Sequence, residues 1–243
     1  MLHGPQRDLF DLEFCVPSEC ADRLAGGMAD IGIAPSVELP RQDLELIPGA
    51  GIASHGAVRS ILLVSKKPQG EIRVLAADSS SRTSVVLARI VLARRYGAEP
   101  LVVPMPPDAP SMLEAADAAL IIGDPALRLD TDRLPYAVTD LGKEWGAMTG
   151  LPMVFAVWAG RRECVTAELR QPFLESCRFG LANIEEIVRR EAEARSVPQA
   201  LAREYLTRQV RFELGEREYE GLRLFLHYAE ELAAVEPSGR VSA

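Results

Sequence analysis

The sequence contains few of the residues that build metal sites, disulfide frameworks or redox centres. Its 243 residues include only 4 cysteines and 3 histidines, and no Cys-x-x-Cys pair occurs. The thiols of Cys15, Cys20, Cys164 and Cys177 are therefore expected to be reduced, with Cys15 and Cys177 buried among apolar neighbours. The absence of closely spaced cysteines and histidines argues against a zinc or disulfide-dependent fold, so we predict no metal site.

Long apolar runs and an excess of basic residues are also absent. No apolar run approaches the roughly 18–20 residues that a membrane-spanning helix requires, and no basic region followed by an apolar core opens the sequence. Lys and Arg number 27 against 35 Asp and Glu, giving a net charge of −8, which disfavours an extended nucleic-acid surface. We expect a soluble, cytoplasmic protein with neither nucleic acid nor a membrane as partner.

Several motifs of common enzyme classes are missing as well. The sequence has no Gly-x-Gly-x-x-Gly, no Walker phosphate loop, no Gly-x-Ser-x-Gly nucleophile elbow and no His-Glu-x-x-His. These motifs position dinucleotides, nucleotide phosphates, acyl-enzyme serines and catalytic zinc respectively. Their absence removes support for nucleotide-dependent, acyl-transfer and zinc-hydrolase functions.

What is present is an alternation of short apolar segments with helical ones, which favours an α/β fold with parallel sheets. The apolar fraction of 48% allows a substantial core. Strands are predicted at residues 12–16, 30–34, 44–47, 60–65, 73–76, 101–103, 118–122, 137–138 and 153–158. Helices are predicted from Pro17, with Ser18 as candidate N-cap, to Gly26, over residues 83–96, and through most of residues 166–234, including one from Pro198 to Gly215.

One segment indicates a crossing between two lobes. A capped helix at residues 141–149 leads through Gly150 and Pro152 into an apolar strand, as expected where the chain passes from one α/β unit into another. A lobe that is interrupted and then resumed resembles the two-lobed type II periplasmic-binding-protein-like fold, in which ligands lie in a cleft between the lobes. We assign residues 1–67 and 155–243, with the C-terminal helices, to lobe 1 and residues 68–154 to lobe 2.

The best candidate for a ligand site is the polar loop that precedes the helix at residues 83–96. Free backbone N–H groups and the helix dipole attract an anion there. The hydroxyls of Ser81, Thr83 and Ser84 add hydrogen-bond donors, and Arg82 adds positive charge. The ligand should therefore carry a carboxylate or phosphate. Ser81 or Thr83 could equally serve as a helix cap.

Two further turns contribute candidates. The arc from Gly51 to Ser60 either directs Ser60 into the cleft or forms a surface loop, and His55 within it either faces a ligand or is solvated. Gly123 and Asp124 follow a buried strand and begin a helix, where Asp124 can cap the helix or contact a ligand while nearby backbone amides face it.

Several segments, in order and spacing, resemble the chorismate dehydratase (MqnA) family of menaquinone biosynthesis by the futalosine pathway. The resemblance extends from about Leu12 to Ala229. The segments are Asp30-Ile31-Gly32-Ile33-Ala34-Pro35-Ser36, Gly51-Ile52-Ala53-Ser54 with Gly56 and Ser60, Ser81-Arg82-Thr83-Ser84-Val85, Ile122-Gly123-Asp124 with Ala126-Leu127, Asp140-Leu141-Gly142 through Thr149-Gly150-Leu151-Pro152 and Trp158, Glu204-Tyr205-Leu206, and Gly221-Leu222.

The resemblance implies a hydro-lyase that removes water from chorismate to give 3-[(1-carboxyvinyl)oxy]benzoate without a cofactor. It implies that the substrate's own enolpyruvyl carboxylate takes the proton, because these motifs contain no evident protein base. By position, Ser60 is the catalytic residue. The implied substrate-binding residues are Ser54, Gly56, Ser81, Arg82, Thr83, Ser84, Gly123 and Asp124.

The family pattern begins with an additional strand and Asn-x-x-Pro-Leu, and the sequence given starts after that point. Either the start is assigned too late, or this version lacks a central strand of its first lobe, which would leave neighbouring strand edges unpaired. Two alternatives to the dehydratase stay open, a small-carboxylate solute-binding protein and the sister dihydroxynaphthoate-forming lyase (MqnD). The oligomeric state, monomer or homodimer, is also open.

Overall fold

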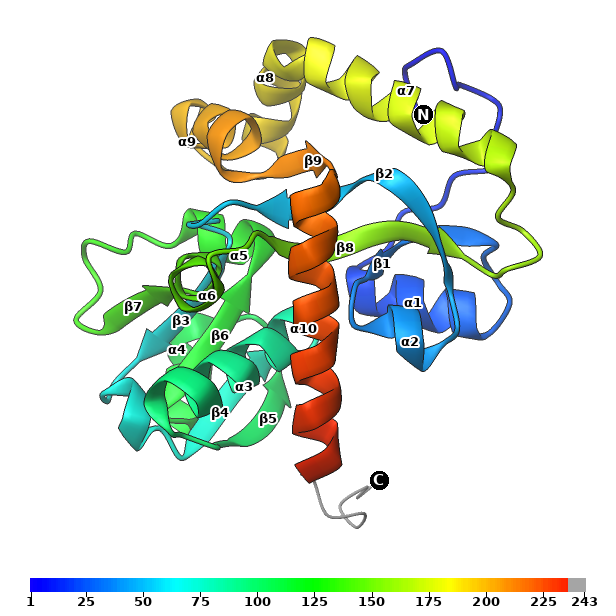
Figure 1. The fold of residues 1–243 in the computed structure, drawn as a ribbon. Coiled ribbons are helices and arrows are strands. Elements are labelled where there is room, and N and C mark those ends of the chain that lie inside the picture. Colours follow the sequence, from blue (N-terminus) through cyan, green and yellow to red (C-terminus); the bar gives the residue numbers. More distant parts are fainter. Residues whose placement is uncertain (236–243) are drawn as a thin grey trace.

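Two β-sheets lie on opposite sides of a long C-terminal helix in the computed structural model, which describes residues 1–235 (Figure 1). The long helix is α10 (Glu216–Val235), and further helices cover the sheets. This arrangement is the two-lobed α/β architecture expected from the interrupted lobe. No helix among the described residues is long and apolar enough to cross a membrane.

The first sheet has four strands in the order β1-β8-β2-β9, and every neighbouring pair in it is antiparallel. Its centre is the strand predicted as the lobe crossing, which pairs with β1 on one side and β2 on the other. The strands are β1 (Ile31–Pro35), β2 (Glu45–Ser54), β8 (Met153–Gly160) and β9 (Arg211–Glu213).

The second sheet has five strands in the order β5-β4-β6-β3-β7. The pairs β4·β5 and β4·β6 are parallel, whereas β3·β6 and β3·β7 are antiparallel. The strands are β3 (Ile61–Ser65), β4 (Val74–Asp78), β5 (Leu101–Met105), β6 (Ala118–Ile122) and β7 (Ala137–Asp140).

This topology corrects two expectations. Parallel pairing is confined to β4, β5 and β6, because only these strands are joined by helical crossovers that return the chain in the same direction. In addition, β3 pairs with β6 and β7, so residues 61–65 belong to the second sheet. The boundary predicted at residue 67 therefore falls one strand too late, whereas β8 begins at Met153, next to the other predicted boundary.

The helices agree with the sequence in the middle of the chain and differ near its end. Helix α3 has the predicted bounds, but the segment expected as one helix from Pro198 to Gly215 forms a short helix, a π-helical turn and β9, and Gly215 precedes α10. The remaining helical segments are α1 (Pro17–Ala25), α2 (Glu38–Arg41), η1 (Gln69–Glu71), α3 (Thr83–Tyr96), α4 (Ala109–Ala115), α5 (Gly123–Arg128), α6 (Leu141–Thr149), η2 (Ala167–Leu169), α7 (Arg170–Ala182), α8 (Ile184–Ala194), α9 (Gln199–Glu204) and the π-helical η3 (Tyr205–Gln209).

The strand predicted at residues 12–16 is not formed. These residues have no assigned secondary structure, and Phe14 is 79% exposed. Strand β1 lies at the end of its sheet, so its outer edge has no strand partner among the described residues. A strand is stable only when its backbone groups are paired, which explains why an apolar, β-prone sequence stays irregular here. The predicted cap at Ser18 is also wrong, because the N-cap of α1 is Val16, without a side-chain bond.

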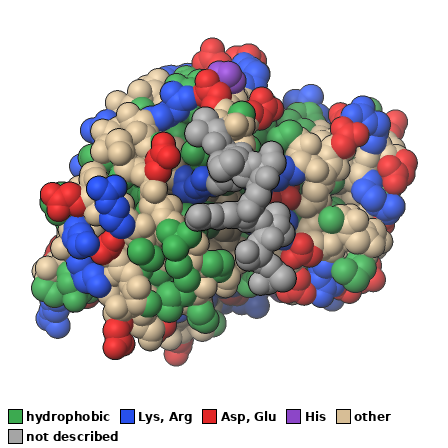
Figure 2. All heavy atoms as spheres, turned by 90° about the horizontal axis from the view of Figure 1, so that it is seen from below, with side chains coloured by type: hydrophobic (Ala, Val, Ile, Leu, Met, Phe, Trp, Pro, Cys, Tyr) green, Lys and Arg blue, Asp and Glu red, His purple; other side chains and the backbone are tan. Residues whose placement is uncertain are grey.

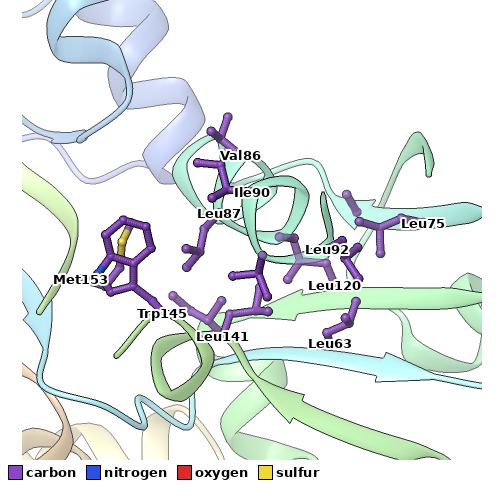
Figure 3. Close-up of a cluster of buried hydrophobic side chains, with 14 of the residues drawn as sticks. Leu63, Leu75, Val86, Leu87, Ile90, Leu92, Leu120, Leu141, Trp145 and Met153 are labelled. Carbon is purple, nitrogen blue, oxygen red and sulfur yellow. The ribbon is translucent and has the colours of Figure 1, made fainter. Parts of the chain in front are cut away.

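A continuous apolar core joins the second sheet to α3 and α6 (Figure 3) and includes Phe225 of α10. Trp145 of α6 is fully buried and packs edge-to-face against Phe225 of α10. Its indole Nε1–H donates to the carbonyl oxygen of Pro152 at 3.0 Å, just before β8. Helix α10 also contacts β8 of the first sheet, so it links the two lobes into one packed unit.

The cysteines and the surface add two observations. All four cysteines are free; Cys20 is buried, but Cys15 is exposed and Cys177 half-buried, which corrects the expectation of two buried thiols. Burial raises the pKa of the Cys20 thiol to about 11. On the face shown in Figure 2, acidic and basic side chains are interspersed, and no extended basic stripe crosses that face.

Candidate active site at the junction of the two sheets

Three of the predicted site segments meet at one edge of the second sheet. Strands β4 and β6 are neighbours and parallel, so the loop after Asp78 and the turn at Gly123 leave the sheet at the same edge. Strand β3 runs antiparallel to β6, with Ile61 opposite Ile122, which places Ser60 at that edge too. The carboxyl edge of parallel strands is where ligands bind in open α/β sheets, near a switch in strand order such as the one at β4.

Ser60 is held firmly at this edge. It is 4% exposed, and its carbonyl oxygen accepts a hydrogen bond from the backbone N–H of Gly123 at 2.8 Å. Its Oγ lies 3.0 Å from the hydroxyl of Tyr205. The structure therefore brings two predicted site residues, Ser60 and Gly123, into direct contact and adds a third residue that was given no role.

The residue before Ser60 is strained and strongly anchored. Arg59 has a φ of +62°, a conformation that costs a side-chain-bearing residue of order 1–3 kcal/mol. Its backbone N–H donates to Asp140 at 2.7 Å, and its guanidinium donates to the carbonyl oxygens of Ala126 at 2.7 Å and Leu129 at 2.6 Å, at the end of α5. Strain of this kind persists only where its surroundings enforce it, so these bonds fix the backbone that presents Ser60.

Gly123 and Asp124 form the start of α5. Gly123 has a φ of +62°, and a Cβ there would meet no atom within 4 Å, so backbone conformation rather than space favours glycine. Asp124 neither caps α5, whose N-cap is Ile122, nor stands free. Its carboxylate pairs with Arg195 at 2.9 Å. Asp124 thus lies beside the site, and Arg195, at the end of α8, neutralises its charge.

The loop before α3 is buried and internally ordered. Ser81, Thr83 and Ser84 are 8%, 2% and 3% exposed. The Oγ of Ser81 accepts a hydrogen bond from the backbone N–H of Ser84 at 3.2 Å, in the first turn of α3, although the N-cap of that helix is Arg82. Upstream, Asp78 accepts bonds from the N–H and hydroxyl of Ser80. Capping leaves other N–H groups of the first turn of α3 available to an anion.

This loop contacts the first lobe directly. The Oγ1 of Thr83 lies 3.4 Å from the Oγ of Ser36 and 3.4 Å from the backbone nitrogen of Val37, just after β1. Ser36 is fully buried and donates to the carbonyl oxygen of Val154 in β8 at 2.8 Å. In a second contact, the N–H of Ser18 donates to the carbonyl oxygen of Ser80 at 3.1 Å. The two lobes are thus in hydrogen-bond contact at the predicted anion site.

Arg82 is engaged by carboxylates of the first lobe. Its guanidinium pairs with Asp22 of α1 at 2.6 Å and with Glu38 of α2 at 3.2 Å. Glu38 is 3% exposed and also pairs with Arg41 at 3.2 Å. In this arrangement Arg82 links the lobes and its charge is neutralised, so backbone amides and hydroxyls are the donors that the loop offers to an anion.

Ser54 and Gly56 lie in a separate, tightly packed turn. The Oγ of Ser54 donates to the carbonyl oxygen of Gly56 at 3.1 Å. A Cβ on Gly142 of α6 would approach that same oxygen to 2.6 Å, so glycine is required at this contact. His55, between them, pairs closely with Glu218 of α10 instead of facing a ligand. These residues support the arc that ends at Ser60.

The Glu218 carboxylate predicts an acid-dependent loss of stability. Burial raises the pKa of Glu218, whereas hydrogen bonds from His55 and from the backbone N–H of Gly215 lower it. The lowering effects together are larger, so the pKa lies below the ordinary value of 4.5. The folded state therefore gains stability above that ordinary value and loses it as the pH falls through the lower, folded-state value. We expect Glu218→Gln to lower the melting temperature at pH 7 and to flatten its decline as the pH falls below the ordinary value of 4.5. Equal slopes in both proteins would contradict this role.

Sequence reasoning left two residues of this junction without a role, one of them buried and the other partly buried. Ser36 and Tyr205 both occur in segments quoted for the family resemblance, and neither was selected as a site residue. The sequence could not show that Ser36 lies next to Thr83 or that Tyr205 lies next to Ser60, because the two pairs are 47 and 145 residues apart. Their only sequence signal is polarity within otherwise apolar or helical segments.

A cavity of about 550 Å³ lies elsewhere, between the first sheet and the C-terminal helices. Its walls are largely apolar and include Ile33, Ile52 and Trp158 from the sheet and Phe173 and Leu181 from α7. None of the nine predicted site residues lines it. Apolar walls offer few hydrogen-bond donors to a doubly charged ligand, and burying its charges there would be costly. The junction of the sheets is therefore the better candidate site.

The sequence matches a known family and a characterised relative. The model of a family described as menaquinone biosynthesis matches residues 3–231. Chorismate dehydratase from Thermus thermophilus is 32% identical over 234 residues, covering 89% of this chain and 85% of that protein.

Solved structures share the fold at low sequence identity. Protein AF1704 from Archaeoglobus fulgidus superposes with a TM-score of 0.73 at 19% identity, covering 91% of this chain and 86% of that one. The periplasmic aliphatic sulphonate binding protein SsuA from Escherichia coli gives a TM-score of 0.62 at 15% identity, covering 92% of this chain and 77% of that one. The architecture is thus the expected two-lobed, periplasmic-binding-protein-like fold, and the chain belongs to the menaquinone biosynthesis family.

Proposed function

We propose that this protein is a chorismate dehydratase, a hydro-lyase that converts chorismate to 3-[(1-carboxyvinyl)oxy]benzoate. The observation that supports it most strongly is the meeting of Ser60, Gly123 and the start of α3 at one sheet edge, within a chain 32% identical to a chorismate dehydratase. The fold alone would not assign this activity, because the same two-lobed architecture is found in a sulphonate-binding protein.

The chemistry of the site suits a small dicarboxylate. Chorismate carries two carboxylates, and the start of α3 offers backbone N–H groups together with the buried hydroxyls of Thr83 and Ser36. An anion bound there exchanges its hydrating water for the fixed dipoles of the backbone N–H groups, and the helix dipole stabilises its negative charge. With the charges of Arg82 and Asp124 already paired, orientation depends on neutral donors. We propose that Ser81, Thr83 and Ser84 face one carboxylate, and that Gly123 and Asp124 form the opposite wall.

The reaction requires little of the protein beyond orientation and proton control. The C–H bond breaks at the ring carbon that bears the enolpyruvyl ether, and the C–O bond breaks at the adjacent carbon that bears the hydroxyl. The electron pair of the C–H bond becomes the new ring double bond, which makes the ring aromatic. In this scheme the substrate's own enolpyruvyl carboxylate receives the proton. Ser60 donates a hydrogen bond to the departing hydroxyl as its C–O bond breaks, and the proton held by the enolpyruvyl carboxylic acid then passes to this oxygen, so that water is released and the carboxylate is regenerated.

A direct assay tests the proposal. Purified protein is incubated with chorismate, and the carboxyvinyloxy-benzoate and residual chorismate are separated by chromatography and identified by mass spectrometry. A product lighter than chorismate by one water, formed in proportion to the protein, is expected. Chorismate retained unchanged by the protein would instead indicate the solute-binding alternative. Chorismate neither bound nor consumed would favour the sister lyase.

A further inference from the structure

We propose that Tyr205 is a positioning residue for Ser60, orienting the serine hydroxyl toward the departing group of the substrate. This inference rests on the proposed dehydratase function and adds a residue to it. Its basis is the 3.0 Å contact between the Tyr205 hydroxyl and the Ser60 Oγ.

The two hydroxyls come from segments that are distant in the sequence and lead into different sheets. Ser60 leads into β3 of the second sheet, whereas Tyr205 lies just ahead of β9, which pairs with β2 of the first sheet. Their contact therefore joins segments that are 145 residues apart in the sequence. The serine is oriented only when the C-terminal segment is packed against α5, beside the site.

The ring of Tyr205 is held by packing that does not involve its hydroxyl. It lies against the cluster of Leu127, Val188 and Ala202, which joins α5 to the C-terminal helices. The backbone at this point is a π-helical turn, in which the N–H of Val210 donates to the Tyr205 carbonyl oxygen at 3.0 Å. Such turns are rare and are frequently found at functional sites. The hydroxyl alone reaches Ser60, so ring and hydroxyl can be tested separately.

Either hydroxyl of the pair can donate, and the arrangement we propose is the one in which Tyr205 donates to Ser60. Burial is the largest influence and raises the pKa of Tyr205; the hydrogen bond with Ser60 lowers it by less, and the nearby charge of Asp124 adds a still smaller increase. The phenol is therefore neutral at physiological pH and keeps its proton to donate. When Tyr205 donates to the Ser60 Oγ, the single proton of the serine is free to point at a substrate oxygen. Without Tyr205, that proton would lose its fixed direction.

The experiment compares Tyr205→Phe, Ser60→Ala and the double variant with the wild type in the chorismate assay. Phenylalanine keeps the ring packing and removes only the hydroxyl. We expect Tyr205→Phe to lower kcat about 10- to 100-fold with KM within about twofold, since one oriented hydrogen bond is lost mainly in the transition state. Adding Tyr205→Phe to Ser60→Ala should cause no further loss, because Tyr205 acts through Ser60.

A matched control is Tyr219→Phe, which removes a hydroxyl that accepts a hydrogen bond from the backbone N–H of Gly49 at 2.7 Å, away from Ser60. This variant should keep wild-type kcat, and melting temperatures report folding for all variants. Unchanged kcat in Tyr205→Phe, or a loss that multiplies with that of Ser60→Ala, would overturn the positioning role while leaving the dehydratase intact. A folded wild type that forms no product would overturn the proposed function, and the role of Tyr205 with it.

Discussion

Ser60→Ala is expected to lower the turnover number for chorismate by about two to four orders of magnitude while the protein stays folded. Ser60 lies 4% exposed where β3 begins, with its backbone fixed by Gly123 and its Oγ beside Tyr205. Alanine removes the only group at this position that can hydrogen-bond the departing hydroxyl, and leaves the backbone contacts unchanged. Steady-state kinetics with product quantified by mass spectrometry measure the effect.

The same strand supplies a matched control. Ser65, at the opposite end of β3, is 2% exposed and uses its hydroxyl in a local bond to the carbonyl oxygen of Lys67. Ser65→Ala also removes one buried hydroxyl, at a cost of about 1 kcal/mol in stability, and should keep wild-type turnover. If both variants lost activity equally, the effect of Ser60→Ala would reflect folding. If Ser60→Ala turned over chorismate normally, Ser60 would have no part in the mechanism.

Gly221→Ala is expected to destabilise the protein by about 3 kcal/mol or more, although alanine normally strengthens a helix by about 1 kcal/mol relative to glycine. Gly221 lies in α10, and a Cβ there would come within 2.0 Å of the Pro152 carbonyl oxygen. That oxygen also accepts the hydrogen bond from Trp145. Relieving the clash requires α10 to move from the strand start and disturbs the buried indole.

A second helical glycine separates crowding from helix propensity. Gly180 lies in α7, and a Cβ there would meet no atom within 4 Å. Gly180→Ala should leave stability unchanged or raise it by up to about 1 kcal/mol. Thermal and urea unfolding of both variants measure the difference. A Gly221→Ala protein as stable as Gly180→Ala would show that α10 does not approach Pro152 this closely.

The two variants also show where local sequence rules succeed and where they fail. The bounds of α3 and the strand beginning at Met153 were predictable because their signals are local. Helix α3 follows a polar loop and ends at a glycine, and the strand is a continuous apolar run. The predictions failed where the structure of a segment depends on a strand that is distant in the sequence. Residues 12–16 have a strand-like composition but do not pair with the free outer edge of β1, whereas the segment after Pro198 forms β9 by pairing with the edge of β2.

The candidate site divides in the same way. The hydroxyl groups and the helix N-terminus that suit an anion come from consecutive residues. This part of the site was therefore predictable from the sequence. The pairing of Arg82 with Asp22 and Glu38, however, depends on the first lobe. A guanidinium that looked available to a ligand is therefore neutralised within the protein.

The sequence by itself determined the family, the α/β class and the residues that can bind an anion, because these depend on motifs and short-range periodicity. Only the tertiary structure decided which of those residues meet. Ser60 and Tyr205 are 145 positions apart, and Gly221 meets Pro152 only where α10 crosses β8. Contacts between distant segments depend on how helices and sheets pack in three dimensions, and no local pattern in the chain specifies that packing.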